Sequence, residues 1–258
     1  MSRTVAWFSA GAASTCAAYL ALQDDPDTVV AYCDPGAEHE DTPRYIADVE
    51  QWLGVEVLQL RSETYTDTWD VFDKTGYLVG PYGARCTTEL KKKLRQGFQL
   101  PDDRQVFGFD ARAKEVKRAN EFRQSNPEVN LWTPLIDAGM GKADCHRMVA
   151  AAGVKKHAMY LLGYKNANCV GCVKGGMGYW NKIRVDFPEV FDRMAKQERK
   201  MGIACCSAEG PKVDGRRTSV PVFLDTLAPN RGRYADEPDT ECGVLCPASV
   251  PPERAEDV

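Results

Sequence analysis

The sequence predicts an α/β protein with an open, mostly parallel sheet, flanking helices and an appended cysteine-rich C-terminal region. Its 258 residues, 43% of them hydrophobic, are enough for one such domain and a sizeable core. An apolar run at residues 4–8 is followed by a loop of small residues and by an alanine-rich helical stretch that extends to Leu22. Strand-like and helix-like patterns keep alternating beyond this point, and that order favours parallel strands with ligands at their carboxyl ends.

The later elements follow from the hydrophobic pattern of each segment. A second apolar run, residues 28–32, leads into the turn sequence Cys33-Asp34-Pro35-Gly36 and reads as a strand. The segment 187–201 has Phe, Val and Met at helical spacing, and we expect this stripe to be core. The remaining predicted elements are helices at 43–53 and 142–152 and strands at 55–60 and 106–109.

Composition limits the classes of function. The net charge of −4 gives no general attraction to nucleic acid, so such a partner would need a local basic patch. Apolar runs are far shorter than a membrane span and no signal-peptide pattern is present, which predicts a cytoplasmic protein without a membrane partner. Ten cysteines in that reducing compartment indicate a metal, a cluster or redox chemistry rather than disulfides.

Three regions are expected along the chain. Residues 1–165 are predicted to form a nucleotide-binding α/β domain. Residues 166–246 are predicted to be a cysteine-rich and helical region with a metal or cluster site and a candidate catalytic cysteine. The tail at 247–258 is rich in Pro, Glu and Asp, which is typical of a mobile end.

The loop at residues 9–14 is a candidate phosphate site. Its small residues let backbone amides approach an anion, the next helix presents its free N–H groups, and Ser9, Gly11 and Ser14 are the candidate contacts. The Gly-Lys-Ser/Thr ending of a Walker loop is missing, and any tight turn in an α/β domain favours the same small residues. Asp34 and Glu38 follow the second strand, where a carboxylate would face ribose or Mg²⁺; a turn-forming Asp and a solvated Glu are the alternative.

The clearest metal-binding pattern is Cys169-Val-Gly-Cys172, because two-residue spacing lets both thiolates reach one metal centre. A redox dithiol uses the same spacing. Cys16 and Cys33 are expected to be small buried residues, and the three histidines lack ligand spacing. Further candidate ligands are Cys86, Cys145, Cys205, Cys206 and Cys246.

Segments spread over residues 5–246 resemble the sulfonucleotide reductases, which act on adenylyl sulfate or its 3′-phosphorylated form and have the adenine-nucleotide α-hydrolase-like fold. The loop at 9–14 is similar to their modified pyrophosphate loop, and residues 32–38 to the stretch that begins Asp-Thr-Gly. The other similar segments are Arg85-Cys86 through Leu94, Val106-Phe-Gly108-Phe-Asp-Ala-Arg112 followed by Arg118, Trp132-Thr-Pro134-Leu135, Leu162-Gly163-Tyr164 through Cys172, Gly232-Arg233-Tyr234, and Thr240-Glu241-Cys242-Gly243.

The resemblance implies a mechanism and a set of roles. Cys242 would attack the sulfur of the bound sulfonucleotide as a thiolate, forming a cysteine S-sulfonate that a thioredoxin- or glutaredoxin-like reductant then cleaves to sulfite. The resemblance also implies contacts from Gly108 and a four-iron cluster, with zinc as the alternative metal. The cations expected around the sulfonucleotide are Lys91, Arg112, Arg118 and Arg233, and the cluster ligands are Cys86, Cys169, Cys172 and a fourth cysteine such as Cys246.

The chain also departs from the family pattern. Arg85 stands where the family has a second cysteine, and Asp239 stands where it has a lysine before Thr-Glu-Cys. The loss of that lysine and the replacement of a following histidine both remove positive charge beside Cys242. An alternative role for Cys242 is that of a metal ligand together with Cys246, Cys169 and Cys172. The alternative is an ATP pyrophosphatase that adenylates a substrate for tRNA or DNA thiolation, in which basic residues would meet nucleic acid. A non-catalytic zinc-stabilised nucleotide-binding module is a third possibility.

Overall fold

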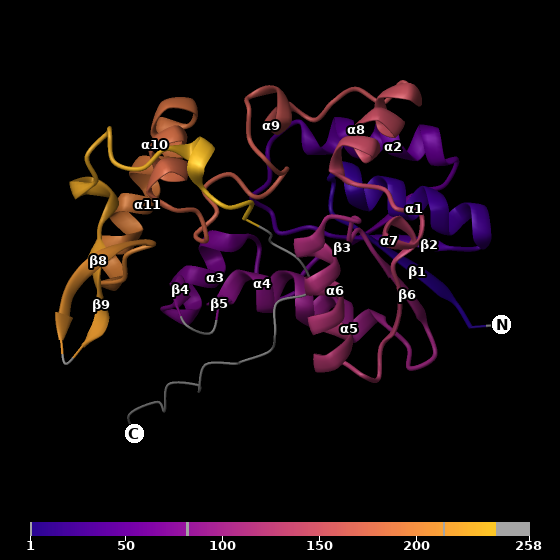
Figure 1. Cartoon of the computed structure of the whole chain (residues 1–258), viewed down its shortest axis with the longest axis horizontal. Helices are drawn as coiled ribbons and strands as arrows, with labels where there is room; N and C mark the ends of the chain where they lie inside the picture. Colours follow the sequence, from indigo (N-terminus) through magenta and orange to yellow (C-terminus); the bar gives the residue numbers. More distant parts are fainter. Residues whose placement is uncertain (1, 81–82, 214, 241–258) are drawn as a thin grey trace.

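The computed structural model describes residues 2–80, 83–213 and 215–240. A five-stranded parallel sheet lies at the centre of the N-terminal half and confirms the predicted α/β fold (Figure 1). The strand order is β3-β2-β1-β6-β7, so the chain builds outward from β1 on one side and then on the other. The strands are β1 (Thr4–Phe8), β2 (Val29–Cys33), β3 (Val57–Leu60), β6 (Arg104–Phe107) and β7 (Asn130–Trp132).

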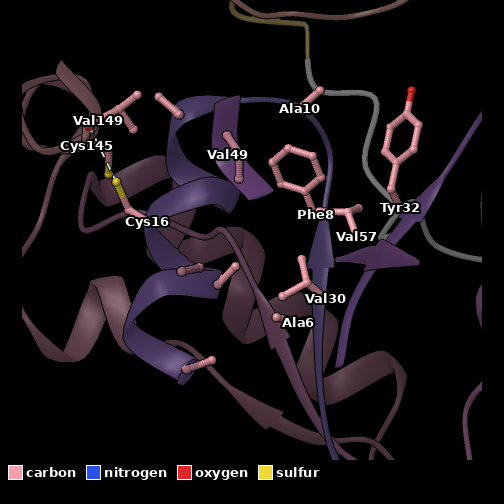
Figure 2. Packing of buried hydrophobic residues seen from close by; sticks show 14 of the residues in the cluster. Ala6, Phe8, Ala10, Cys16, Val30, Tyr32, Val49, Val57, Cys145 and Val149 are labelled. Carbon is pink, nitrogen blue, oxygen red and sulfur yellow. Dashed lines mark hydrogen bonds between the residues drawn. The ribbon is translucent and has the colours of Figure 1, made fainter. Parts of the chain in front are cut away.

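Helices cover both faces of this sheet. Alternate residues of a strand point to opposite faces, and all five residues of β1 are buried. Ala6 and Phe8 pack with α1, α2 and α8, as Figure 2 shows for part of that cluster, whereas Val5 and Trp7 pack with α5 and α6. The helices of this half are α1 (Ala12–Asp24), α2 (Thr42–Leu53), α5 (Lys93–Phe98), α6 (Ala113–Ser125), α7 (Pro134–Asp137), α8 (Lys142–Ala151) and α9 (Ala158–Leu161).

Three cysteines of the sheet half are buried, and for two of them, Cys16 and Cys33, the sequence predicted this. Cys16 on α1 is fully buried against α8, where its thiol donates to the carbonyl oxygen of Cys145 at 3.4 Å, and Figure 2 places the two side chains next to each other. Cys33 at the end of β2 is also buried, and burial raises the pKa of its thiol to about 11. Both are core residues.

A second core lies beside the sheet half and is built around α10 (Met177–Asp186) and α11 (Pro188–Met201). Met194 is fully buried and Phe191 nearly so, which confirms that the Phe and Met stripe is core. A hairpin extends from this unit at the far edge of the molecule (Figure 1). The remaining elements here are α3 (Thr68–Thr75), β4 (Val79–Gly80), β5 (Gly83–Ala84), α4 (Arg85–Thr87), the π-helical turn η1 (Thr88–Lys92), β8 (Cys206–Val213), β9 (Arg216–Val222), and the 3₁₀ turns η2 (Leu224–Thr226) and η3 (Tyr234–Asp236).

The second core is not confined to the C-terminal part of the chain. Trp69, Phe72 and Leu78 pack in the same cluster as Trp180 and Met194. The N-terminal segment 68–84 therefore belongs structurally with residues after 166. The predicted boundary at residue 165 does not coincide with the boundary between the core around the sheet and the second core, because the second core also contains residues from 68–84.

Candidate functional site

A cleft opens at the carboxyl ends of β1 and β6, the point where the strand order reverses. Parallel α/β sheets bind ligands at this place because loops diverge there in opposite directions. The cleft joins segments that are remote in sequence and includes most of the predicted nucleotide contacts. Its polar and glycine lining residues are Ser9, Gly11, Ser14, Lys91, Gly108, Asp110, Arg112, Glu115, Arg118, Lys142, His146, Tyr160, Asn166 and Asn168.

The loop at residues 9–14 forms the floor of the cleft. Ser14 Oγ accepts from the backbone N–H of Ser9 at 3.0 Å and donates to the carbonyl of Gly11 at 2.9 Å, so its hydroxyl fixes the shape of the loop. Ala10 has φ of +52°, a left-handed conformation that costs an alanine about 1–2 kcal/mol. Gly11 is the N-cap of α1 and has no side chain to cap it. The first N–H groups of α1 therefore have no hydrogen bond to a side chain of the N-cap residue, and such groups are able to bind an anion.

Gly108 permits close contact between β6 and the start of α1. A Cβ at this position would lie 2.7 Å from the Ser14 backbone nitrogen and 2.8 Å from its Cα. Those atoms belong to the backbone and cannot rotate away. Gly108 therefore sets the width of the cleft floor.

Three predicted cations, Lys91, Arg112 and Arg118, line the cleft. Lys91 extends from η1, and π-helical turns of this kind occur often at functional sites. Its ammonium is buried and lies 3.5 Å from Glu38. Arg118 is 2.5 Å from Glu115.

Arg112 is held on one side by Asp110, to which its Nε donates at 2.8 Å. Hydrogen bonding to Asp110, and secondarily to Asp239, raises the pKa of Arg112 above its already high usual value. Asp110 is 2% exposed, so it is a buried support for the guanidinium. The remaining guanidinium nitrogen Nη1 faces Asp239 at 3.0 Å.

Asp34, Glu38 and Arg233 are predicted contacts that do not line this cleft. Asp34 closes a turn by accepting from Gly36 N–H at 2.8 Å and pairs with Arg61. The side chain of Glu38 is 5% exposed and accepts from Tyr32 Oη at 2.7 Å. Arg233 is largely exposed and lies 3.6 Å from Asp236.

Residues 234–240 cross from the second core to the mouth of the cleft. Tyr234 packs against the ring of Tyr164, with centroids 5.5 Å apart. The Glu237 carboxylate accepts from the backbone N–H groups of Gly176, Gly178 and Tyr179 at 3.0, 2.5 and 3.0 Å, at the N-terminus of α10. A carboxylate at a helix N-terminus is favourable because it satisfies free N–H groups and opposes the positive end of the helix dipole.

The next residues reach the cleft itself. Asp239 lies between Arg112 at 3.0 Å, Lys114 at 3.1 Å and Lys142 at 3.5 Å. Burial raises the pKa of Asp239, but hydrogen bonds from Arg112 and Lys114 and the charge of Lys142 lower it to about 2. The Thr240 carbonyl then accepts from the amides of Asn166 and Asn168 at 3.0 and 2.7 Å. The last described residue therefore lies against two residues of the cleft wall.

Of the candidate metal ligands, Cys86, Cys172, Cys205 and Cys206 lie in the second core, whereas Cys145 is buried beside Cys16 in the sheet half. Val170 N–H donates to the carbonyl of Ala37, which joins the 169–172 turn to the loop after β2. Cys86, Cys172, Cys205 and Cys206 pack in one cluster. The pKa of the Cys205 thiol is raised well above its usual range by burial and then by the nearby Glu198 carboxylate and the Cys206 and Cys86 thiols. Within the described ranges, no three or more His, Cys, Asp or Glu residues form a group arranged to hold a metal ion. Cys242 and Cys246 lie outside the described residues, as does the predicted tail.

Several cleft residues escaped prediction. Lys142 and His146 lie on α8, whose apolar pattern was recognised but whose first turn carried no motif. Burial, then the charges of Lys156 and Lys142, lower the pKa of His146, which favours the neutral imidazole. Asn166 and Asn168 directly precede Cys169, so the signal available was their place in the segment leading to the paired cysteines.

Comparison with known proteins leaves the family open, since no family model matches the chain. It is similar to an uncharacterized protein of Methanocaldococcus jannaschii, with 25% identity over 198 residues that cover 72% of this chain. The chain spans about two fifths of that relative's length, 39%. Among the helices of the described ranges, none is long and apolar enough to cross a membrane.

Proposed function

We propose that this chain belongs with the sulfonucleotide reductases and converts an adenylyl sulfonucleotide to sulfite and a nucleoside monophosphate. The observation that supports this best is the arrangement of the cleft. An anion loop and three cations predicted from the resemblance lie in one cleft, and residues 237–240 bring the chain to its mouth. Cys242 follows Thr240 by two residues in the sequence.

The described residues would bind and polarise the substrate. The N–H groups at the start of α1 and the loop would hold the phosphate on the nucleoside. Lys91, Arg112 and Arg118 would offset the charge of the sulfate, which must accept attack by an anion. Since these side chains are already held by Glu38, Asp110 and Glu115, their positions are set before the substrate arrives.

The chemistry implied by the resemblance has two steps. The Cys242 thiolate would form a bond to the substrate sulfur while the S–O bond to the nucleotide phosphate breaks, and the nucleoside monophosphate leaves with that electron pair. One thiolate of a thioredoxin- or glutaredoxin-type reductant then attacks Cys242 Sγ and sulfite leaves; its second thiol breaks the resulting mixed disulfide, which frees Cys242 and leaves the reductant as a disulfide. Such a reductant acts in a reducing compartment, in line with the proposed cytoplasmic location.

The test is sulfite release from adenylyl sulfate and from its 3′-phosphorylated form, with reduced thioredoxin in excess. The wild-type protein should release sulfite and Cys242→Ser should release none. The rate of sulfite release by Arg112→Gln should be about 100-fold lower than that of wild type, because the substitution removes a charge beside the reacting group. Arg216→Gln, on the exposed hairpin, is the matched control for loss of an arginine. Absence of sulfite with both nucleotides from folded protein would refute the proposal.

A second candidate function is ATP pyrophosphatase activity coupled to thiolation of tRNA or DNA. The observation that favours it is Asp239, whose carboxylate faces the cleft cations in a position where the resemblance leads us to expect a lysine. Carboxylates near bound phosphates suit Mg²⁺, which would accompany ATP. Release of pyrophosphate from ATP, without sulfite from either sulfonucleotide, would favour this activity.

A metal centre at Cys86, Cys169 and Cys172 stays a proposal, with Cys205 or Cys246 as the fourth ligand. The packing of Cys86, Cys172 and Cys205 in one cluster supports it, although these residues do not form a ligand group by themselves. An iron–sulfur cluster there would supply charge or redox chemistry; zinc would supply structural support. Iron, sulfide and zinc analysis of anaerobically purified wild type, Cys172→Ser, Cys205→Ser and Cys246→Ser decides among these, with Cys145→Ser as the control.

A further inference from the structure

We propose that a side cavity next to the cleft binds the planar base of the nucleotide ligand, and that His146 hydrogen-bonds to the edge of that base. The side cavity lies among α1, α2, α8 and α9, which are neighbours in Figure 1, and has a volume of about 270 Å³. The inference rests on the proposed function only in that the ligand is a nucleotide. That condition holds for adenosine 5′-phosphosulfate and for ATP alike.

The cleft above the loop at residues 9–14 is too small to hold a nucleotide by itself. Its volume is about 120 Å³, whereas pockets for small ligands usually enclose about 300–1,000 Å³. The side cavity is more than twice as large as the cleft, and Ala12, His146 and Tyr160 line both spaces. A ligand whose phosphate is bound at the start of α1 therefore has the side cavity as adjoining space for its remaining part.

Tyr160 on α9 brings the side cavity next to the proposed phosphate site. A Cβ added at Gly11, the N-cap of α1, would lie 3.4 Å from Tyr160 Oη. The position of α9 is fixed from the start of α2, because the Asp41 carboxylate accepts from the Ala158 N–H at 2.8 Å. The boundary between the two spaces is therefore built before a ligand binds.

The walls of the side cavity suit an uncharged aromatic ring. Tyr45 Oη lies 3.1 Å from Thr15 Oγ1, so the polar atom of this lining residue is bonded within the protein. His157 also uses both ring nitrogens, since Nε2 lies 3.1 Å from Thr42 Oγ1 and Nδ1 accepts from the Met159 N–H at 3.2 Å. These rings offer mainly carbon surface, on which an aromatic base packs well and a charged group would lose its hydration.

His146 is the lining residue that can recognise the edge of the base. Its ring packs edge to face on Tyr160, with centroids 4.7 Å apart, at the boundary of the two spaces. Burial, then the charges of Lys156 and Lys142, lower the pKa of His146 and favour the neutral imidazole, which has one donor and one acceptor nitrogen. The edge of adenine carries an amino donor next to a ring-nitrogen acceptor, so either tautomer of His146 finds a partner there.

The first test compares calorimetric binding of AMP and of ribose 5-phosphate, which has the same sugar and phosphate but no base, to the full chain. We expect AMP to bind at least about tenfold more tightly, because packing of a base on aromatic side chains contributes that much or more. Ala150→Phe adds a ring to the cavity from an exposed position of α8 and should weaken AMP binding about tenfold without changing that of ribose 5-phosphate. Ala151→Phe is the matched control, because Ala151 is the next residue of the same helix, is exposed and does not line the cavity.

Two substitutions separate the hydrogen bond of His146 from its packing. His146→Phe keeps an aromatic ring and should weaken AMP binding by about two- to tenfold more than binding of ribose 5-phosphate. His146→Gln keeps a donor and an acceptor and should recover part of that loss. Equal losses for AMP and ribose 5-phosphate in both variants would rule out contact of His146 with the base.

The position of the base can be observed directly by NMR. In the complex with AMP, the base protons H2 and H8 should show nuclear Overhauser effects to the methyl groups of Val149 and Ala150, which line the side cavity. Equal affinity for AMP and ribose 5-phosphate, no binding of AMP, or a bound base without these effects would overturn the proposal. Because no measurement here needs turnover, a base in the cavity without sulfite release would refute only the reductase activity, and sulfite release with the base elsewhere would refute only the side cavity as its site.

Discussion

Gly108→Ala should damage the floor of the cleft. The new Cβ would lie 2.7 Å from the Ser14 nitrogen, 2.8 Å from its Cα and 3.0 Å from the Ala13 carbonyl carbon. Ordinary contact begins near 3.4 Å, so β6 and the first turn of α1 must separate by about 0.6 Å or more. Overpacking of this kind costs about 1–3 kcal/mol of unfolding free energy.

Gly108→Ala should also weaken ligand binding in the cleft, because the displaced atoms belong to the proposed phosphate loop. If the same 1–3 kcal/mol is lost from binding, adenosine 5′-phosphosulfate binds about 5- to 150-fold more weakly. Urea unfolding gives the stability change and calorimetry gives the affinity. The matched control is Gly97→Ala, because a Cβ added at Gly97 in α5 would have no atom within 4 Å; alanine should stabilise that helix by about 0.5–1 kcal/mol.

The two alanine variants should therefore change stability in opposite directions. A Gly108→Ala protein with wild-type stability and wild-type affinity would show that β6 and α1 can move apart freely. It would refute the claim that their close contact sets the cleft.

Three further outcomes follow from particular contacts. Ala10→Gly should change stability by less than about 1 kcal/mol, because relief of the φ of +52° is offset by loss of a fully buried methyl group and by the greater freedom of glycine in the unfolded chain; a change above about 2 kcal/mol in urea would contradict this. Glu237→Gln should cost about 1 kcal/mol and speed hydrogen exchange at the start of α10, with Glu209→Gln on the exposed hairpin as control, and unchanged exchange would rule out its capping role. Burial lowers the pKa of His157 to about 4, below its usual 6.5, so the unfolded chain binds the extra proton first and stability falls as pH drops from about 6.5 to about 4. This contribution is at most about 3 kcal/mol, and it should be absent from His157→Asn in urea unfolding at pH 7.5, 6 and 4.5; an identical pH profile would exclude it.

The sheet could be predicted from sequence because its signals are local. The apolar run of β1, the small-residue loop and the alanine-rich α1 each reveal themselves within a few residues. Gly108 could be identified from the resemblance. The structure gives the physical reason for a glycine there, because the backbone at 108 approaches the backbone of Ser14 too closely for any larger residue. The charges that complete the site are different: Lys142 and Lys114 are ordinary helix-start lysines in sequence, and only the packing of α6 and α8 beside the cleft brings both to Asp239.

The surroundings of Asp239 could not be predicted from the sequence either. In sequence it was a departure that removed a positive charge from beside Cys242. In the structure it lies 3.0 to 3.5 Å from nitrogens of three cationic side chains and offsets part of their charge. A sequence motif shows which charged residue is present, but not which other charged side chains it contacts in the folded protein.

The composition of the second core has a consequence for synthesis of the chain. Trp69, Phe72 and Leu78 emerge from the ribosome about a hundred residues before Trp180 and Met194, their partners in the same core. Until those partners are made, this apolar segment stays exposed beside a sheet that is already complete, as β7 ends at Trp132. A nascent or truncated chain that stops at residue 165 should therefore need chaperone protection or aggregate, whereas extension through residue 227 supplies the missing cover.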